Sequence, residues 1–330
     1  MRIGVIGLGY WGPNLVRNLL ALGHRVHVYD RDRERVEAAA VRFPEVVAAT
    51  SLAAILDDPE LAAVAIAVPL TQHAPLIVQA LDAGKHVFVE KPLCATLAEA
   101  DAIGARLGGR VLAVGHITQY SPGLRAFRDS IQRGAIGRLC CLDLVRTHLG
   151  PIYPGSDVLT EVAAHDVAIL LSLRSEPLAR VHAWGAARLD LGRADSACLL
   201  VEWSEGVFAR VAAGWASARR QRQATAEGTR GTLAFEVVDG RERLELHHQA
   251  EALAQLREGR GPQAAREVTR VEAPDLPSAE PLAEELRAFV ACVETGARPE
   301  VDLGFARRVV AVLEAARRSM ERGGKGEPVS

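Results

Sequence analysis

Residues 2–12 read RIGVIGLGYWG, and this stretch decides the fold of the first third of the chain. Arg2–Ile6 has the composition of a short β-strand, and Asn14–Leu22 has the apolar spacing of an amphipathic helix. The GxGxxG turn between them therefore leads from a strand into a helix, which is the context of a dinucleotide-binding site.

The glycines of this turn have separate physical tasks. Gly7 permits a tight turn, Gly9 lets the backbone approach a pyrophosphate, and Gly12 lets the helix pack closely on the strand. The first turn of the helix then offers N–H groups and a partial positive charge to phosphates. We expect the turn to contact the cofactor through Gly7, Gly9, Tyr10, Trp11 and Gly12.

An acidic residue favours NAD as the cofactor. The second predicted strand, Arg25–Tyr29, is followed directly by Asp30. A carboxylate at this place accepts hydrogen bonds from the ribose hydroxyls and repels the 2′-phosphate of NADP. The neighbouring Arg31 could bind a 2′-phosphate, so NADP is the less favoured alternative cofactor.

The order of the predicted elements divides the chain into two domains. Strands and helices alternate over residues 1–118, which predicts an α/β domain with a doubly wound parallel sheet. Over residues 119–330 two helices are followed by a run of strands, which predicts an α+β domain with a largely antiparallel sheet. We expect residues 248–280 to form loop and residues 323–330 to form a frayed tail.

Composition excludes several classes of protein. The 330 residues are 49% hydrophobic and carry a net charge of −2, so no bulk positive field is available for nucleic acid or an anionic membrane. We found no apolar run long enough to span a bilayer and no cleavage pattern of a signal peptide. The five cysteines lack CxxC spacing, which fits a reducing cytoplasm, and no metal site is predicted.

Two further segments follow predicted parallel strands, at the sheet edge where ligands of such folds bind. Pro69 and His73 follow the strand over residues 64–68, and Glu90, Lys91 and Pro92 end the strand that begins at His86. We include these residues among the candidates for cofactor contact. For His73, and for His116 further along, the alternative is a structural role in capping a loop.

Together these segments resemble the Gfo/Idh/MocA family of NAD(P)-dependent oxidoreductases. The resemblance rests on GLGYWG at residues 7–12, the strand-end Pro69 with His73, VEKPL at residues 89–93 and EVAAHD at residues 161–166. It covers nearly the whole chain and is strongest with a bacterial branch associated with nucleotide-sugar biosynthesis.

The resemblance implies specific roles. Lys91 matches the active-site lysine of the family, and Pro92 matches the proline that shapes its loop, often with a cis peptide. His165 matches the catalytic acid/base, and Glu161 stands where the family usually has aspartate. The residues themselves fit these roles, because oxidation of an alcohol needs a base for the hydroxyl proton and a cation beside the developing alkoxide.

The implied activity is hydride transfer between NAD and a secondary alcohol or ketone of a sugar, nucleotide sugar or cyclitol. We expect the active site in the cleft between the two domains, and a homo-oligomer formed through the sheet of the second domain. The alternative is a non-catalytic NAD-binding sensor, which would need neither Lys91 nor His165.

Basic residues of the predicted second sheet leave two interpretations open. Arg146 and His148 lie two apart on a strand, so they face one side and are candidates for substrate contact. The run at residues 219–222, RRQR, either meets a substrate diphosphate or forms a solvent-exposed strand face, and the exposed face is the favoured interpretation.

Overall fold

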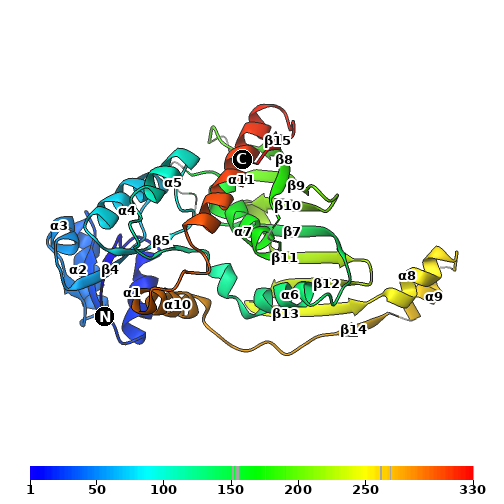
Figure 1. The fold of residues 1–330 in the computed structure, drawn as a ribbon, viewed down its shortest axis with the longest axis horizontal. Coiled ribbons are helices and arrows are strands. Elements are labelled where there is room, and N and C mark those ends of the chain that lie inside the picture. Colours follow the sequence, from blue (N-terminus) through cyan, green and yellow to red (C-terminus); the bar gives the residue numbers. More distant parts are fainter. Residues whose placement is uncertain are drawn as a thin grey trace. The chain divides into compact units, whose positions relative to one another are not determined.

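The computed structural model of the protein describes residues 1–150, 152, 156–174, 176–189, 191–260, 262–267 and 269–329. Its chain forms two compact units (Figure 1). The first unit contains Met1–Tyr120 and Glu280–Val310, and the second contains Ser121–Ala279 and Ala311–Ser330. Residues 280–310, which the predicted boundaries of 1–118 and 119–330 assign to the second domain, pack with the first unit.

The first unit is built on a six-stranded sheet of order β3-β2-β1-β4-β5-β6. Every neighbouring pair is parallel, and the order reverses between β1 and β4, so the sheet is doubly wound as predicted. The strands are β1 Arg2–Ile6, β2 Arg25–Tyr29, β3 Val47–Ala48, β4 Leu61–Ile66, β5 His86–Glu90 and β6 Leu112–Gly115.

Helices cover both faces of this sheet, and each face has its own apolar core. The helical segments are α1 Gly12–Ala21, α2 Arg33–Arg42, α3 Leu52–Leu56, η1 Leu70–Gln72, α4 His73–Asp82, α5 Leu97–Gly104, η2 Ile117–Tyr120, α10 Pro281–Thr295 and the first part of α11 Leu303–Glu321. Among the described residues, no helix is long and apolar enough to cross a lipid bilayer.

Helix α10 belongs to this unit because of its apolar stripe. Leu282, Leu286 and Phe289 recur at helical spacing and are buried in the same core as Leu15 and Leu19 of α1. Figure 1 shows α10 beside α1, although the two helices are more than two hundred residues apart in the sequence.

The second unit is built on a nine-stranded sheet of order β14-β13-β12-β11-β7-β10-β9-β8-β15. All neighbouring pairs are antiparallel except β7 and β10, which confirms a largely antiparallel sheet. The strands are β7 Leu139–Leu149, β8 Leu178–Ala186, β9 Ser196–Trp203, β10 Phe208–Gly214, β11 Ala216–Gly228, β12 Gly231–Val238, β13 Arg241–His248, β14 Arg270–Glu272 and β15 Glu327–Pro328.

The helical segments of this unit are α6 Pro122–Gln132, η3 Leu159–Ala163, α7 Ala164–Leu173, α8 Ala250–Arg257, α9 Pro262–Glu267 and the end of α11. The prediction of loop over residues 248–280 was therefore wrong in part, since α8, α9 and β14 lie there. The mixture of charged residues with glycine and proline in this stretch concealed the short amphipathic turns.

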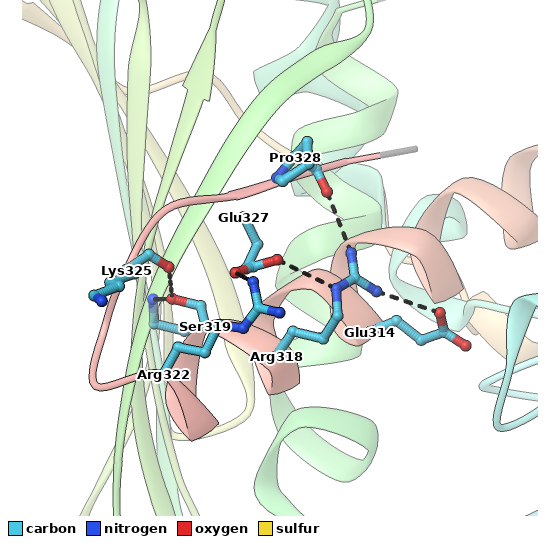
Figure 2. Close-up of polar contacts among 8 residues, drawn as sticks. Glu314, Arg318, Ser319, Arg322, Lys325, Glu327 and Pro328 are labelled. Atoms are coloured by element: carbon cyan, nitrogen blue, oxygen red, sulfur yellow. Dashed lines mark hydrogen bonds and ion pairs between the residues drawn. The ribbon is translucent and has the colours of Figure 1, made fainter.

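The prediction of a frayed C-terminal tail was also wrong. Glu327 and Pro328 pair with Val181 and Arg180 of β8, and thereby add an edge strand to the sheet. Figure 2 shows how the tail is held: the buried Glu327 carboxylate accepts hydrogen bonds from Arg322 at 2.8 Å and Arg318 at 3.4 Å. Ser319 in addition donates its hydroxyl to the carbonyl of Lys325, at 2.6 Å. Ser330 lies outside the described residues.

Candidate active site

The glycine-rich turn lies at the carboxyl end of β1, where the strand order reverses. Gly7 has a positive φ of 95°, and a Cβ there would overlap the backbone of Ala67. A Cβ at Gly12 would overlap the carbonyl oxygen of Gly7. Among the described residues, a Cβ at Gly9 would meet Arg35 alone, at 3.6 Å, so space is open beside the backbone where a pyrophosphate would approach.

The start of α1 fits the same interpretation. Its N-cap residue Trp11 makes no side-chain hydrogen bond to the helix, Pro13 lies in the first turn, and that turn carries no acidic residue. The N–H groups at the helix start are therefore not occupied by a side-chain cap and are suited to an anion. Tyr10 beside them is 75% exposed, and Trp11 is half-buried.

Asp30 lies against this turn. One carboxylate oxygen accepts a hydrogen bond from the backbone N–H of Leu8 at 2.7 Å, and the other accepts from that of Asp32 at 2.9 Å. Only 7% of the side chain is exposed, and Arg35 is 3.7 Å away. Each oxygen keeps accepting capacity for a ribose hydroxyl. The exposed Arg31 follows directly in the chain.

This arrangement predicts the result of Asp30→Asn. The amide oxygen still accepts from Leu8, but the negative charge that disfavours a 2′-phosphate is gone, while Arg31 and Arg35 remain. We expect the ratio of kcat/KM for NAD to that for NADP to fall by about tenfold or more, the size of one charged hydrogen bond. Asp32→Asn is the matched control. A ratio that stays the same in the Asp30 variant would contradict the assigned role.

His73 connects the two loops that follow β4 and β5. Its ring nitrogens lie 2.9 Å from the carbonyl oxygens of Val68 and Pro92. Burial lowers the pKa of His73, and the two carbonyl groups act against this shift. The contacts correspond to the structural alternative of the sequence analysis, in which His73 caps loop structure. Pro69, the N-cap of η1, is exposed.

Lys91 follows β5 at the same sheet edge and is half-buried. The peptide bond between Lys91 and Pro92 is cis. Burial, and then the nearby positive charge of Lys91, lower the pKa of His116 to about 3, so His116 is neutral in the physiological range. His116 is fully buried, and neither of its ring nitrogens has a hydrogen-bond partner among the described residues.

A buried acid that is not among the sequence candidates lies in this unit. Glu285 of α10 is 2% exposed, and neither carboxyl oxygen has a hydrogen-bond partner in the described part of the chain. Burial, and then the negative charge of Glu90, raise the pKa of Glu285 well above its usual value. Glu90 itself packs against Gly115, where a Cβ would lie 3.2 Å from its carboxyl group.

Glu285→Gln is expected to change how stability depends on pH. Because the pKa is raised in the folded state, folding is unaffected by this group below the ordinary value of about 4.5. Above that pH the free energy of unfolding falls by up to about 1.4 kcal/mol per pH unit until the folded pKa is reached. Glutamine removes this loss, so the variant should gain stability over the original protein as pH rises.

Urea denaturation of both proteins between about pH 4 and pH 8 measures this difference. Glu284→Gln, a neighbour that forms an ion pair with Arg287, is the control. Parallel stability curves for the Glu285 variant and the original protein would show that the carboxyl group titrates normally.

In the second unit, Glu161 and His165 lie at the start of the helix that packs on β7 and β10. This helical segment begins with a π turn, η3, that contains Glu161, and continues as α7 from Ala164. Single π turns are frequent at functional sites. Glu161 and His165 are both half-buried, whereas Val162, Ala163 and Ala164 between them are buried, so the two share the more open face.

The next residue, Asp166, points the other way, into the unit. Its carboxylate accepts hydrogen bonds from Arg146 of β7 at 2.8, 3.1 and 3.2 Å. Burial raises the pKa of Asp166, and the Arg146 charge opposes this shift. Arg146, a sequence candidate for substrate contact, instead binds the helix that carries His165.

A doubly wound sheet with open space at its glycine turn, and with a buried carboxylate after β2, defines a dinucleotide-binding protein. Comparison with family models also gives a dinucleotide-binding protein and identifies its chemistry as oxidoreduction. Residues 1–116 match the oxidoreductase family with an NAD-binding Rossmann fold, and residues 124–234 match the GFO/IDH/MocA C-terminal domain. The chain therefore belongs to the GFO/IDH/MocA oxidoreductase family. This confirms the predicted family, the fold class, the oxidoreductase class and NAD as the cofactor.

Curated relatives are dehydrogenases. The chain is 30% identical over 223 residues to a UDP-N-acetylglucosamine 3-dehydrogenase from Acidithiobacillus ferrooxidans, an alignment covering 64% of this chain and 66% of that one. It is 30% identical over 225 residues to inositol 2-dehydrogenase 2 from Saccharopolyspora erythraea, again with 64% and 66% coverage. The alignments thus span about two thirds of each relative. Their names agree with the predicted oxidoreduction of sugar-like substrates.

Solved structures extend the similarity to the full chain. The Acidithiobacillus ferrooxidans UDP-N-acetylglucosamine 3-dehydrogenase superposes with a TM-score of 0.84 at 26% identity, covering 98% of both chains. A levoglucosan dehydrogenase in complex with NADH and levoglucosan has a TM-score of 0.86 at 19% identity, with 100% of this chain and 99% of that one covered. At that identity the second match concerns the fold alone.

Proposed function

We propose that the protein catalyses reversible, NAD-dependent oxidation of a secondary alcohol on a sugar, nucleotide sugar or cyclitol. The observation that carries this proposal is that Lys91 follows β5 at the sheet edge that also holds the glycine turn. An ammonium group is thereby placed at the ligand-binding edge of a dinucleotide domain. In this assignment residues 1–118 bind the cofactor, with residues 280–310 packed in the same unit, and the rest of residues 119–330 binds substrate.

The roles of the side chains follow from their chemistry. NAD, when bound, supplies the acceptor for the hydride that leaves the carbinol carbon. His165 takes the hydroxyl proton, and Lys91 donates a hydrogen bond to the oxygen as negative charge develops on it. Glu161, one helical turn before His165, orients the imidazole and stabilises its protonated form. Gly7, Gly9, Tyr10, Trp11, Gly12, Asp30, Arg31, Pro69, Glu90 and Pro92 remain our candidates for cofactor contact, whereas His73 supports the two loops through its backbone contacts.

A screen for NADH formation tests this function. Inositols, aldoses, UDP-sugars and the corresponding acids are incubated with the protein and NAD, and the absorbance of NADH is followed. We expect turnover with at least one class of compound. If NADH binds but no compound is turned over in either direction, the protein acts instead as a non-catalytic NAD-binding sensor.

We further propose that the protein is cytoplasmic and that the outer face of the nine-stranded sheet joins two copies. Cross-strand register places Trp184, Cys198 and Phe208 on one face, together with the ion pair between Arg210 and Asp143. Trp184 is 51% exposed and Phe208 is 45% exposed. Exposed aromatic residues on an open sheet face are typical of an association surface.

Phe208→Glu is expected to weaken this association. A carboxylate at position 208, whose cross-strand neighbour is Glu202, would have to be buried in the proposed interface without a partner, so we expect the dissociation constant to rise by about tenfold or more. Analytical ultracentrifugation over a concentration series measures the change, with the exposed Val41→Glu as control. A monomer at all concentrations in the original protein would contradict the proposed assembly.

A further inference from the structure

Four basic side chains gather on β7 and β11 in the second unit: Arg146, His148, Arg220 and Arg222, referred to below as the basic cluster. Arg146 and Arg222 are direct cross-strand partners, so their side chains lie on the same face of the sheet. His148 is two residues from Arg146 and lies on that face as well. The positive charges of Arg222, Arg146 and Arg220 lower the pKa of His148, in addition to burial.

The charge of the cluster is not balanced. Arg146 is 9% exposed and engages the buried Asp166, whereas Arg220 and Arg222 are exposed. Among the described residues, neither Arg220 nor Arg222 lies within ion-pair distance of a carboxylate. Partial desolvation by neighbouring groups, and then the charges of Arg146 and Arg220, lower the pKa of Arg222, and Asp166 offsets this only in part.

Three guanidinium groups thus lie near one carboxylate, and their charges disfavour a further positive charge on His148. Repulsion between adjacent cations lowers stability, so the arrangement is unfavourable without an anion. Guanidinium groups are well suited to bind one, because their planar forks match phosphate and carboxylate oxygens.

The cluster adjoins the helix assigned to catalysis. Asp166, the partner of Arg146, is the residue directly after His165 in α7. An anion bound by Arg220 and Arg222 would therefore lie beside the helix that carries the proposed proton acceptor. Neutral cyclitols and aldoses have no anionic group that would form ion pairs with Arg220 and Arg222.

We propose that the basic cluster binds an anionic substituent of the substrate, with Arg220 and Arg222 as its ligands. The substrate class is then a sugar that carries a phosphoryl or a carboxylate group. The inference rests on the proposed function, because it concerns the substrate of the same site.

Isothermal titration of the NADH-saturated protein tests the proposal. The probes are UDP-glucose, glucose 6-phosphate and glucuronate, with glucose and myo-inositol as neutral comparators. We expect at least one anionic probe to bind about tenfold or more tightly than glucose, with an affinity that falls as salt is raised. Tight binding of the phosphorylated probes alone identifies a phosphoryl group as the ligand, and tight binding of glucuronate identifies a carboxylate.

Variants assign the binding to these residues. Arg220→Gln/Arg222→Gln should reduce the preference for the anionic over the neutral probe by about tenfold or more. Arg219→Gln changes an adjacent exposed arginine and should leave the preference unchanged. If the double variant does not fold, Arg222→Lys replaces it, since a single ammonium keeps the charge but loses the fork and should bind more weakly.

Two results would overturn the inference: no anionic probe binding more tightly than glucose, or an unchanged preference in the double variant. The arginines then form the solvent-exposed strand face that the sequence also allowed. Failure of the proposed function is a separate result. It would appear as arginine-dependent anion binding without hydride transfer to or from any compound in the NADH screen.

Discussion

Replacing Lys91 with methionine is expected to reduce turnover by about 10²- to 10⁴-fold, the range that one positioned proton-transfer or charge-stabilising group contributes. Methionine has a similar length and no charge. The substitution therefore removes the ammonium group that stabilises the developing alkoxide, while a side chain of similar size still fills the loop. Cofactor affinity should change little, since the glycine turn and Asp30 are untouched. Steady-state kinetics and a fluorescence titration with NADH separate the two effects.

His165→Asn should give a loss of similar size, because no other group is assigned to accept the hydroxyl proton. Its loss should diminish as pH rises, when solvent hydroxide replaces the missing base. Lys325→Met and His247→Asn are matched controls, since Lys325 is exposed near the C-terminus and His247 lies on β13. Full activity in both the Lys91 and the His165 variant would refute the assigned roles.

Arg146→Met is expected to lower the free energy of unfolding by about 3–5 kcal/mol, the cost of leaving a buried charge without its partner. Asp166 has only 2% of its side chain exposed, and its pKa is already raised by burial. Without Arg146 this pKa rises further, so Asp166 is protonated in the folded state at moderately acid pH. The loss should therefore be small at low pH and should grow as pH rises above the ordinary pKa of aspartate.

Arg210→Met provides the comparison. Its ion pair with Asp143 has the same chemistry and a similar length, 2.7 Å, but the two side chains are 51% and 45% exposed. Water screens such a pair, and the expected loss is below about 1 kcal/mol. The double variant Arg146→Met/Asp166→Leu should recover much of the stability lost in the single variant. Equal losses for Arg146→Met and Arg210→Met, measured by urea denaturation, would contradict the distinction.

Local patterns in the sequence predict the parallel sheet because short runs rich in valine and isoleucine alternate with segments of helical spacing. Strand β13 was missed because it reads RERLELHH, in which only Leu244 and Leu246 mark the buried side. The assignment of residues 280–310 to the first unit also depends on packing. The apolar stripe of α10 predicts a buried face, but no local signal says which sheet it covers.

The sequence likewise predicts part of the candidate site. The glycine turn and Asp30 carry a spacing with a direct physical meaning, and Lys91 and His165 came from family resemblance. The sequence also contains a pattern that marks Glu285 as unusual. This residue stands three residues after Leu282 and one before Leu286, on the apolar stripe of α10, where a charged residue is unexpected. The pairing of Arg146 with Asp166 has no such signal, because only the fold brings a strand and a distant helix together.

The ordered C-terminal end affects how the protein should be handled in the laboratory. Glu327 and Pro328 pair with β8, and Arg318 and Arg322 donate hydrogen bonds to the Glu327 carboxylate. An affinity tag or fluorescent fusion attached there would therefore disturb an edge strand of the sheet. If the tag separates Glu327 and Pro328 from β8, backbone N–H and C=O groups of β8 lose their partners and can pair with strands of other protein chains. Recombinant versions in which Glu327 and Pro328 stay paired with β8 are therefore expected to remain in solution at concentrations where versions lacking these residues precipitate.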